Sequence, residues 1–269
     1  MAFTHLVARR DGAVEHLTLN RPDVRNAFNE EMIDELSGWA ISRHADPTVR
    51  AAVLRGAGPV FSAGGDLSWM ARTVDFTREQ NLHDAEALAQ MYGRLDTLPF
   101  PLIGCVHGAA LGGGSGLAAV CDIVIAARDA IFGFTEVRLG IVPAIISPHV
   151  VAKIGQSAAR ELFLTGARFS AERAREIGLV HAVVEPGELE DEVRRTVDGV
   201  LACGPQAVAA AKALIRQAAG GPSAQTAGLA AEVLADARVS DEGQEGLRAF
   251  LEKRRAAWRA DAEAGRGRQ

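Results

Sequence analysis

Short apolar runs separated by polar turns fill the first two-thirds of the chain and predict β-strands. Residues 3–8 and 13–19 flank a turn at Gly12, which predicts a hairpin. Apolar runs at residues 51–54, 101–106 and 121–127 predict buried strands, and residues 130–134 predict a shorter one.

Helical spacing appears between these runs and dominates the last third. Met32, Leu36 and Trp39 recur at helical intervals behind Asn29, a residue suited to cap a helix start. Residues 77–95 predict a second helix. Four or five helices are expected from about residue 148 to the C-terminus. This shift predicts an α/β core over residues 1–201 and a helical region over residues 202–269.

Composition narrows the class of protein. The 269 residues are 48% hydrophobic and 23% charged, as is usual for globular proteins, and no apolar run is long enough to cross a bilayer. A formal net charge of −5 argues against nucleic acid as a partner. Three cysteines and seven scattered histidines form no metal-binding spacing, so no metal is expected. We therefore expect a cytoplasmic protein without a membrane partner.

Three consecutive glycines, Gly112 to Gly114, join an apolar strand to an apolar helix. A phosphate-binding Walker loop is excluded because no lysine follows them. Leu117 stands where a dinucleotide-binding loop or a hydrolase nucleophile elbow needs its last glycine. Two interpretations remain open: a tight structural turn, or a turn whose free N–H binds an oxyanion.

A second glycine turn and one carboxylate extend the second interpretation. Gly64 and Gly65 follow a strand, and Asp66 is placed to cap the helix after them, so the N–H of Gly65 is a candidate second donor. Glu136 follows the short strand at residues 130–134. Its position fits either a salt-bridged surface residue or a desolvated acid/base.

Taken in order, the motifs resemble the enoyl-CoA hydratase/isomerase (crotonase) superfamily over nearly the whole chain. The motifs are Leu19-Asn20-Arg21-Pro22, Asn26-Ala27-Phe28, Phe61-Ser62-Ala63-Gly64-Gly65-Asp66-Leu67, Gly108 to Gly114, Cys121-Asp122-Ile123, Phe132-Gly133-x-x-Glu136, Leu162 to Gly166, Ala174-x-x-Ile177-Gly178-Leu179-Val180 and Phe250 to Arg254. The resemblance implies an α/β fold, a crotonase-like spiral of ββα turns. It also implies a C-terminal helical region that builds homotrimers or dimers of trimers, an acyl-CoA thioester substrate, and no cofactor other than the coenzyme A of that substrate.

The resemblance also assigns roles to single residues. The oxyanion donors fall on the N–H groups of Gly65 and Gly113, and the acid/base falls on Glu136. Positions that bind the substrate or coenzyme A fall on Arg25, Ala27, Ala63, Gly65, Asp66, Leu67, Gly113, Phe250 and Lys253. The last two are expected to reach the coenzyme A of a neighbouring subunit.

One departure leaves the reaction open. Standard hydratases of this family carry a second glutamate at the position that Gly116 occupies here. Residues 66–70 and 142–148 resemble the branch that contains 3-methylglutaconyl-CoA hydratases, whose substrates bring their own carboxylate. We therefore expect a hydratase that adds water across the 2,3 double bond of an enoyl-CoA, either a plain one or a carboxylated or branched one. The alternatives are an enoyl-CoA isomerase with a single glutamate, and a non-catalytic acyl-CoA-binding or RNA-binding relative.

Overall fold

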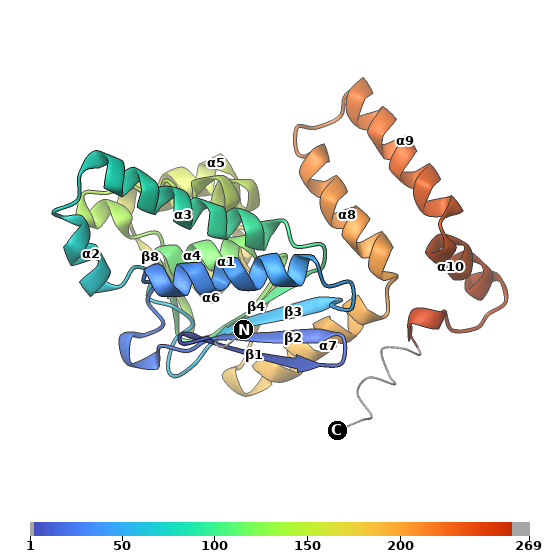
Figure 1. Cartoon of the computed structure of the whole chain (residues 1–269), viewed down its shortest axis with the longest axis horizontal. Coiled ribbons are helices and arrows are strands. Elements are labelled where there is room, and N and C mark those ends of the chain that lie inside the picture. The colour runs from blue at the N-terminus through green and yellow to red at the C-terminus, as the bar shows by residue number, and fades with distance from the viewer. Residues whose placement is uncertain (1–2, 260–269) are drawn as a thin grey trace.

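The computed structural model describes residues 3–259, and a six-stranded sheet forms the centre of the molecule (Figure 1). The strand order is β1-β2-β3-β4-β6-β9; β1 and β2 are antiparallel and every other pair is parallel. The bounds are β1 Leu6–Asp11, β2 Val14–Leu19, β3 Ala51–Gly56, β4 Leu102–Val106, β6 Ile123–Ala127 and β9 Ala182–Val184. The predicted hairpin and the three predicted buried strands are thereby confirmed.

Helices cover both faces of this sheet, because neighbouring strand residues point to opposite sides. Val53 packs with α7 (Leu189–Leu201) on one face. Leu54 belongs to the larger core on the other face. That core includes residues of α1 (Glu30–His44), α3 (Arg78–Asp96), α4 (Gly113–Val120), α5 (Ser147–Thr165) and α6 (Ala171–Glu176).

The predicted cap and apolar stripe of α1 are confirmed. The side chain of Asn29 accepts a hydrogen bond from the backbone nitrogen of Met32 at 3.0 Å. Met32, Leu36 and Trp39 are all buried. This helix therefore packs on the sheet through the face that the sequence indicated.

A smaller sheet carries the elements that matter for function. Its strands are β5 (Ala109–Leu111), β7 (Ile131–Gly133) and β8 (Arg168–Ser170), and β7 is the strand predicted at residues 130–134. β5 and β7 are parallel, with Leu111 paired to Gly133. The carboxyl ends of parallel neighbours meet at one edge, so the glycine turn after β5 and Glu136 after β7 lie together.

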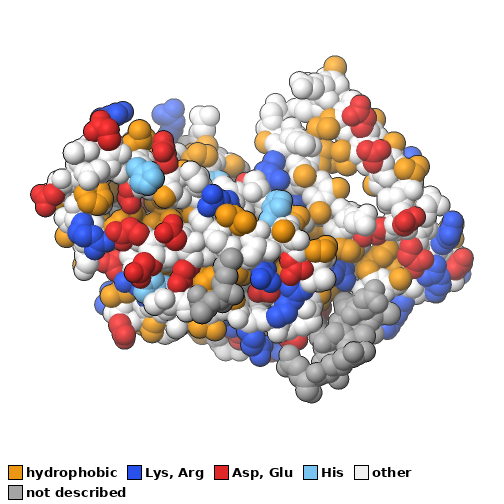
Figure 2. All heavy atoms as spheres, in the orientation of Figure 1, with side chains coloured by type: hydrophobic (Ala, Val, Ile, Leu, Met, Phe, Trp, Pro, Cys, Tyr) orange, Lys and Arg blue, Asp and Glu red, His pale blue; other side chains and the backbone are white. Residues whose placement is uncertain are grey.

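The C-terminal helices form an arm that extends from the core (Figure 1). The arm consists of α8 (Pro205–Ala218), α9 (Ala224–Val239) and α10 (Asp241–Leu251). Lys212 ties α8 to the sheet through an ion pair with Asp122 at 2.6 Å. Apolar side chains remain on the surface of the arm (Figure 2), namely Ile215, Leu234, Val239, Leu247, Phe250 and Leu251.

The expected number of helices after residue 147 was too low. Residues 147–259 contain six α-helices, not four or five. The short α6 follows β8 directly and begins where Ser170 accepts a hydrogen bond from the backbone of Arg173; a six-residue helix is too short for a helical repeat to show in the sequence. No helix within residues 3–259 combines the length and apolar character that crossing a bilayer requires.

Candidate active site

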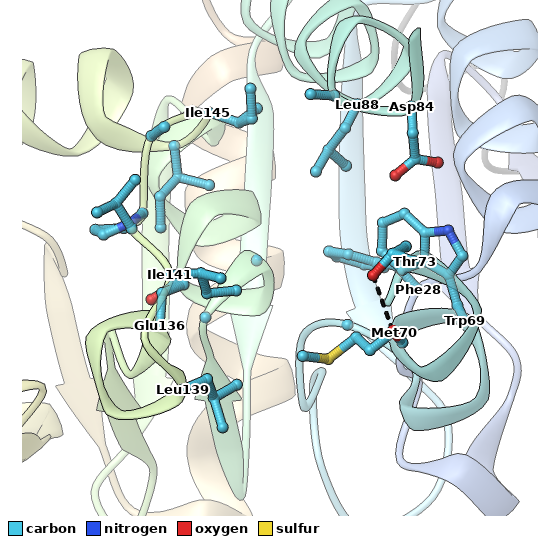
Figure 3. A pocket seen from close by; sticks show the side chains of 18 of the residues that line it. Phe28, Trp69, Met70, Thr73, Asp84, Leu88, Glu136, Leu139, Ile141 and Ile145 are labelled. Carbon is cyan, nitrogen blue, oxygen red and sulfur yellow. Dashed lines mark hydrogen bonds between the residues drawn. The ribbon is translucent and has the colours of Figure 1, made fainter. Parts of the chain in front are cut away.

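A cavity of about 440 Å³ lies at the edge where β5 and β7 end (Figure 3). The two glycine turns and Glu136 all contribute to its wall. The remaining wall is mostly apolar and comes from α2 (Leu67–Thr73), α3 and the segment before α5. Lining residues outside the turns include Phe28, Ala63, Leu67, Trp69, Met70, Thr73, Asn81, Asp84, Leu88, Tyr92, Leu139, Ile141, Val142, Pro143, Ala144, Ile145 and Ile146.

The first glycine turn presents a free N–H group at a helix start. Gly112 has φ 50° and ψ −121°, a conformation that only glycine adopts easily, and it precedes the first residue of α4. That first residue is Gly113. No acceptor for its N–H is found within residues 3–259, as is normal for the first turn of a helix. The positive end of the helix dipole therefore faces the cavity.

The second turn lies directly against the first. Gly64 has φ 90°, and a Cβ atom added to it would lie 2.7 Å from the carbonyl oxygen of Leu111 and 3.3 Å from the nitrogen of Gly113. The N–H of the next residue, Gly65, also has no acceptor in the described chain. The structure thus brings the N–H groups of Gly65 and Gly113 to one cavity.

Glu136 lies beside the first turn and forms no ion pair with any residue of the described chain. A Cβ atom added to Gly112 would lie 3.3 Å from Oε1 of Glu136. The other carboxylate oxygen, Oε2, is buried and has no hydrogen-bond partner among the described residues. Burial raises the pKa of this carboxyl above its usual value of 4.5. These features fit the desolvated acid/base and not the salt-bridged surface residue.

Tyr92 is a site residue that the sequence did not indicate. It is fully buried on α3, and its hydroxyl donates a hydrogen bond to the carbonyl oxygen of Gly113 at 2.7 Å. Burial, and then the negative charge of Glu136, raise the pKa of this phenol. In the sequence, Tyr92 belongs to a run with Met91 and Leu95 that is typical of a helix core.

The position of the missing second glutamate is occupied from another segment. A Cβ atom added to Gly116 would overlap Cγ2 of Ile146 and lie 3.0 Å from Cβ of Ile146 and from the hydroxyl of Tyr92. Ile146 is itself buried and lines the cavity. A glutamate side chain therefore has no room at Gly116 in this packing.

A second carboxylate faces the cavity from α3. Asp84 points toward the cavity from the wall opposite Glu136, above the ring of Trp69 (Figure 3). Desolvation raises the pKa of Asp84, and Trp69 partly offsets this effect. A signal was present in the sequence: Asp84, Leu88 and Tyr92 are four residues apart, so they share one helix face, and all three line the cavity.

Of the other predicted binding residues, some line the cavity and others lie outside its lining. Ala63 and Leu67 line the cavity, and the carbonyl oxygen of the exposed Arg25 accepts a hydrogen bond from the nitrogen of Ala63 at 2.9 Å. Ala27 is buried outside the lining. The carboxylate of Asp66 caps α2 and pairs with Arg21 at 2.9 Å, so its groups are already in use.

Phe250 and Lys253 do not reach the cavity of their own chain. They lie at and just beyond the end of α10, on the arm, while α2 lies at the opposite end of the molecule (Figure 1). Both side chains are exposed, and Phe250 has 82% of its surface accessible.

Comparisons with known proteins cover almost the whole chain. The family model described as enoyl-CoA hydratase/isomerase matches residues 9–261. A putative enoyl-CoA hydratase of Thermus thermophilus is 36% identical over 93% of this chain and 98% of its own length. A 2,3-dehydroadipyl-CoA hydratase of Escherichia coli is 34% identical over 94% and 97%. The crystal structure of an enoyl-CoA hydratase from Shewanella pealeana superimposes with a TM-score of 0.92 at 39% identity, covering 95% of this chain and 96% of that one.

Proposed function

Because the chain belongs to the enoyl-CoA hydratase/isomerase family, we propose that it binds an enoyl-CoA thioester and adds water across the 2,3 double bond. One observation carries the proposal. Glu136, which has a carboxylate oxygen without a partner among the described residues, lines the same cavity as Gly65 and Gly113, whose N–H groups have no acceptor in residues 3–259. An acid/base and two oxyanion donors are the groups this reaction needs.

The two N–H groups would bind the thioester oxygen. When water adds to C3, negative charge moves through C2 to that oxygen and gives an enolate. Two fixed donors at a helix start stabilise this charge without reorganising. Gly65 and Gly113 act through their backbone, so their lack of side chains leaves the thioester room to approach.

Glu136 alone would carry out both proton transfers of the reaction. Its ionised carboxylate takes a proton from the attacking water as the oxygen bonds to C3. The protonated carboxyl then returns that proton to C2 when the enolate collapses. The carboxyl ends the cycle ionised, and the substrate has gained the elements of water. A carboxyl with a raised pKa suits this exchange because it holds a proton more readily than an exposed one.

An enoyl-CoA isomerase is the second candidate, since a single carboxylate can also move a proton between two carbons. A second glutamate has no room at Gly116, and this observation is compatible with an isomerase. The names of the relatives from Thermus thermophilus and Escherichia coli favour the hydratase. A non-catalytic acyl-CoA or RNA binder would have no use for a desolvated, unpaired carboxylate beside two free N–H donors.

The narrower prediction of a carboxylated or branched substrate, such as 3-methylglutaconyl-CoA, is not supported by the charges of the cavity. Its described lining contains Glu136 and Asp84 but no lysine, arginine or histidine. A substrate carboxylate would be desolvated near two like charges. The Escherichia coli relative is nevertheless named for 2,3-dehydroadipyl-CoA, so both kinds of substrate belong in the test.

Assembly through the arm completes the proposal. The exposed apolar residues of α8–α10 fit a surface that packs against other copies, as a homotrimer or a dimer of trimers. In such an assembly Phe250 and Lys253 would reach the coenzyme A bound to a neighbouring subunit. Arg25 and Ala63 would lie near the coenzyme A bound in the cavity of their own chain. A cytoplasmic location remains a prediction from the sequence.

Product analysis tests the reaction. The protein is incubated with crotonyl-CoA, 3-methylglutaconyl-CoA and a 3-enoyl-CoA, and each product is identified by mass and by loss of the enoyl absorbance. A product heavier by one water supports the hydratase. A 2-enoyl-CoA formed from the 3-enoyl-CoA, without hydration of either conjugated thioester, would replace it with the isomerase.

A further inference from the structure

The loop between β2 and α1 is held in an unusual backbone conformation. It carries the motifs Leu19 to Pro22 and Asn26 to Phe28, but neither Arg21 nor Asn26 acts in the proposed reaction. Arg25 and Asn26 have φ values of 57° and 53°, in the left-handed region that residues other than glycine adopt rarely. Strain of this kind persists only where the surrounding structure holds it, and it is frequent beside active sites.

This loop fixes the direction of the N–H group of Gly65. The nitrogen of Phe28 donates a hydrogen bond to the carbonyl oxygen of Gly64 at 2.7 Å, and the nitrogen of Asp66 donates to the carbonyl oxygen of Phe28 at 2.8 Å. The carbonyl of Gly64 and the N–H of Gly65 belong to one planar peptide group and point in opposite directions. The orientation of this oxyanion donor therefore depends on where the loop places Phe28.

Asn26 holds the loop against the segment that follows β3. Its side chain is fully buried. The oxygen Oδ1 accepts a hydrogen bond from the nitrogen of Arg21 at 2.9 Å, and Nδ2 donates to the carbonyl oxygens of Ala57 and Val60 at 2.8 and 2.9 Å. Both ends of the amide are thus used, and they join the loop to the chain that leads into the second glycine turn.

Ser62 links this loop to both glycine turns. It is fully buried, and its hydroxyl donates to the carbonyl oxygen of Asn26 at 2.9 Å and accepts from the nitrogen of Gly64 at 3.2 Å. Its backbone pairs with β5, accepting from the nitrogen of Leu111 and donating to the carbonyl oxygen of Ala109, both at 3.0 Å. β5 leads into the first turn, so Ser62 contacts the supports of both donors.

The two donors come from separate segments, and their effect depends on the distance between them. A thioester oxygen is stabilised only when both N–H groups lie at hydrogen-bond distance from the place where its charge develops. Apolar packing is not directional, whereas hydrogen bonds fix the orientation of a peptide group. Asn26 and Ser62 supply such bonds on the side of the turns away from the cavity, since neither belongs to its described lining.

We propose that Asn26 and Ser62 are positioning residues of the reaction, which set the direction of the Gly65 donor and its distance from the Gly113 donor. This inference rests on the proposed function, because it takes the thioester oxygen as the group that both donors bind. It gives a role to buried polar residues that never touch the substrate.

Ser62→Ala tests the link with little change in volume. The hydroxyl is lost and no atom is added, so we expect a folded protein whose kcat is about tenfold lower, with KM nearly unchanged, because the donors act most strongly in the transition state. Ser37→Ala is the matched control, since Ser37 is buried in α1 and lies outside the described lining; its kcat should stay that of the native protein. An unchanged kcat in folded Ser62→Ala, or an equal fall in Ser37→Ala, would overturn the proposal.

Asn26→Asp tests the other residue of the pair. Aspartate keeps the acceptor for Arg21 and tolerates the left-handed conformation, but it places an oxygen against the carbonyls of Ala57 and Val60. We expect a lower melting temperature and a lower kcat. Because both residues act on one turn, the double variant with Ser62→Ala should lose less than the product of the single effects on kcat. If Asn26→Asp does not fold, Ser62→Ala and the spectroscopic measurement below decide.

Infrared spectroscopy of a bound thioester separates this inference from the proposed reaction. Butyryl-CoA labelled with ¹³C at the thioester carbonyl has no double bond to hydrate, and its C=O stretch reports the hydrogen bonds that the carbonyl accepts. We expect the bond to the two donors to lower this frequency in the native protein and in Ser37→Ala, and to lower it less in Ser62→Ala. That result supports the positioning role even if no enoyl-CoA is hydrated, in which case only the hydratase proposal fails. Equal shifts in the native protein and Ser62→Ala, or no shift in the native protein, would overturn the positioning role whatever the enzyme catalyses.

Discussion

The hydroxyl of Tyr92 donates its hydrogen bond, 2.7 Å long, to the carbonyl oxygen of Gly113, the residue whose N–H faces the cavity. The peptide before Gly113 carries that N–H, and the peptide after it carries the bonded carbonyl. A group on α3 therefore holds the first residue of α4 in position. Tyr92 has no exposed surface and its hydroxyl proton is already donated to Gly113, so it acts as a positioning residue for the glycine turn.

Tyr92→Phe should lower kcat more than it lowers stability. Removing one neutral hydrogen bond costs about 1 kcal/mol of unfolding free energy. A small displacement of an oxyanion donor lowers the rate because it acts only in the transition state. We expect kcat to fall about tenfold, equivalent to about 1.4 kcal/mol, with KM nearly unchanged.

Met91→Leu is the control for Tyr92→Phe. Met91 is the buried neighbour of Tyr92 in α3 and does not line the cavity, and this exchange nearly conserves volume. It should lower the melting temperature slightly and leave kcat unchanged. If both variants lose stability to the same degree and neither loses turnover, Tyr92 serves packing alone.

Glu136→Gln should remove turnover and change how stability depends on pH. We expect kcat to fall at least about a hundredfold, the usual contribution of a general acid/base. Burial raises the pKa of Glu136 in the folded state above its usual 4.5. The folded protein therefore binds this proton more tightly than the unfolded chain does, and the native protein loses stability relative to the variant as pH rises from about 4.5 through the raised pKa.

Denaturant titrations at several pH values measure this difference. The free energy of unfolding of the variant is subtracted from that of the native protein at each pH. This difference cancels the contributions of the other carboxyls. Several of these have lowered pKa values, for example Asp66 and Glu245, and therefore change stability with pH in the opposite direction. The acid limb of kcat/KM should also lie above pH 4.5, because the ionised form takes the proton from water. A difference in stability that does not change with pH would show that Glu136 is not desolvated in the free enzyme.

Gly65→Ala is a better test of the oxyanion turns than Gly113→Val. A Cβ atom on Gly113 would lie 2.7 Å from the ring of Phe28 and 3.0 Å from the hydroxyl of Tyr92, so valine there would disturb the core. On Gly65 the new atom would meet the flexible end of Met70 at 3.2 Å, on the cavity side. We expect kcat/KM to fall about a hundredfold, the scale of losing one donor.

Gly93→Ala provides the matched glycine-to-alanine control. Gly93 lies in α3, and a Cβ atom there would meet no neighbouring atom within 4 Å. Alanine should stabilise this helix by about 0.5–1 kcal/mol without changing turnover. Equal activity of Gly65→Ala and the native protein, in folded samples, would make the second turn a structural feature only.

Leu251→Glu tests assembly through the arm. Leu251 is 77% exposed at the end of α10, among other exposed apolar residues. If these residues pack between copies, a charge there is desolvated without a partner and the assembly dissociates. Light scattering at micromolar concentration should show the mass of a trimer or hexamer for the native protein and a smaller mass for the variant. Leu164→Glu, equally exposed but on α5, should leave the mass unchanged.

The sequence predicted the parts of the site that depend on backbone and failed where side chains from distant segments meet. The glycine turns and Glu136 follow strand ends, so local pattern and strand pairing were sufficient to place them. Tyr92 and Asp84 lie on α3, where the apolar spacing indicates only a packed helix. Their spacing, a multiple of four residues, places them on one face of α3, but the cavity that this face meets depends on how α3 packs against α2 and α4, which no local pattern contains.

Gly116 shows the same limit. In the sequence, this glycine marks the position at which the second glutamate of standard hydratases is absent. The structure shows that Ile146, thirty positions along the chain, fills the space beside it. The sequence revealed that the second carboxylate was missing, but not what had taken its place.

Gly116→Glu by itself should therefore destabilise the fold and lower activity on plain and carboxylated substrates alike. The added atoms overlap Ile146, and overpacking of this kind costs about 1–3 kcal/mol before the buried charge is counted. Ile146→Ala alone should also destabilise, by about 2–5 kcal/mol, because it leaves a cavity.

Combined, the two changes compensate in volume, so the double variant should melt higher than the sum of the single effects predicts. It should also hydrate crotonyl-CoA faster than Ile146→Ala does, because the new carboxylate shares the proton transfers with Glu136. Melting curves and initial rates of all four proteins check this; strictly additive losses would show that Ile146 does not exclude the side chain, and a faster double variant would show that the missing carboxylate limits hydration.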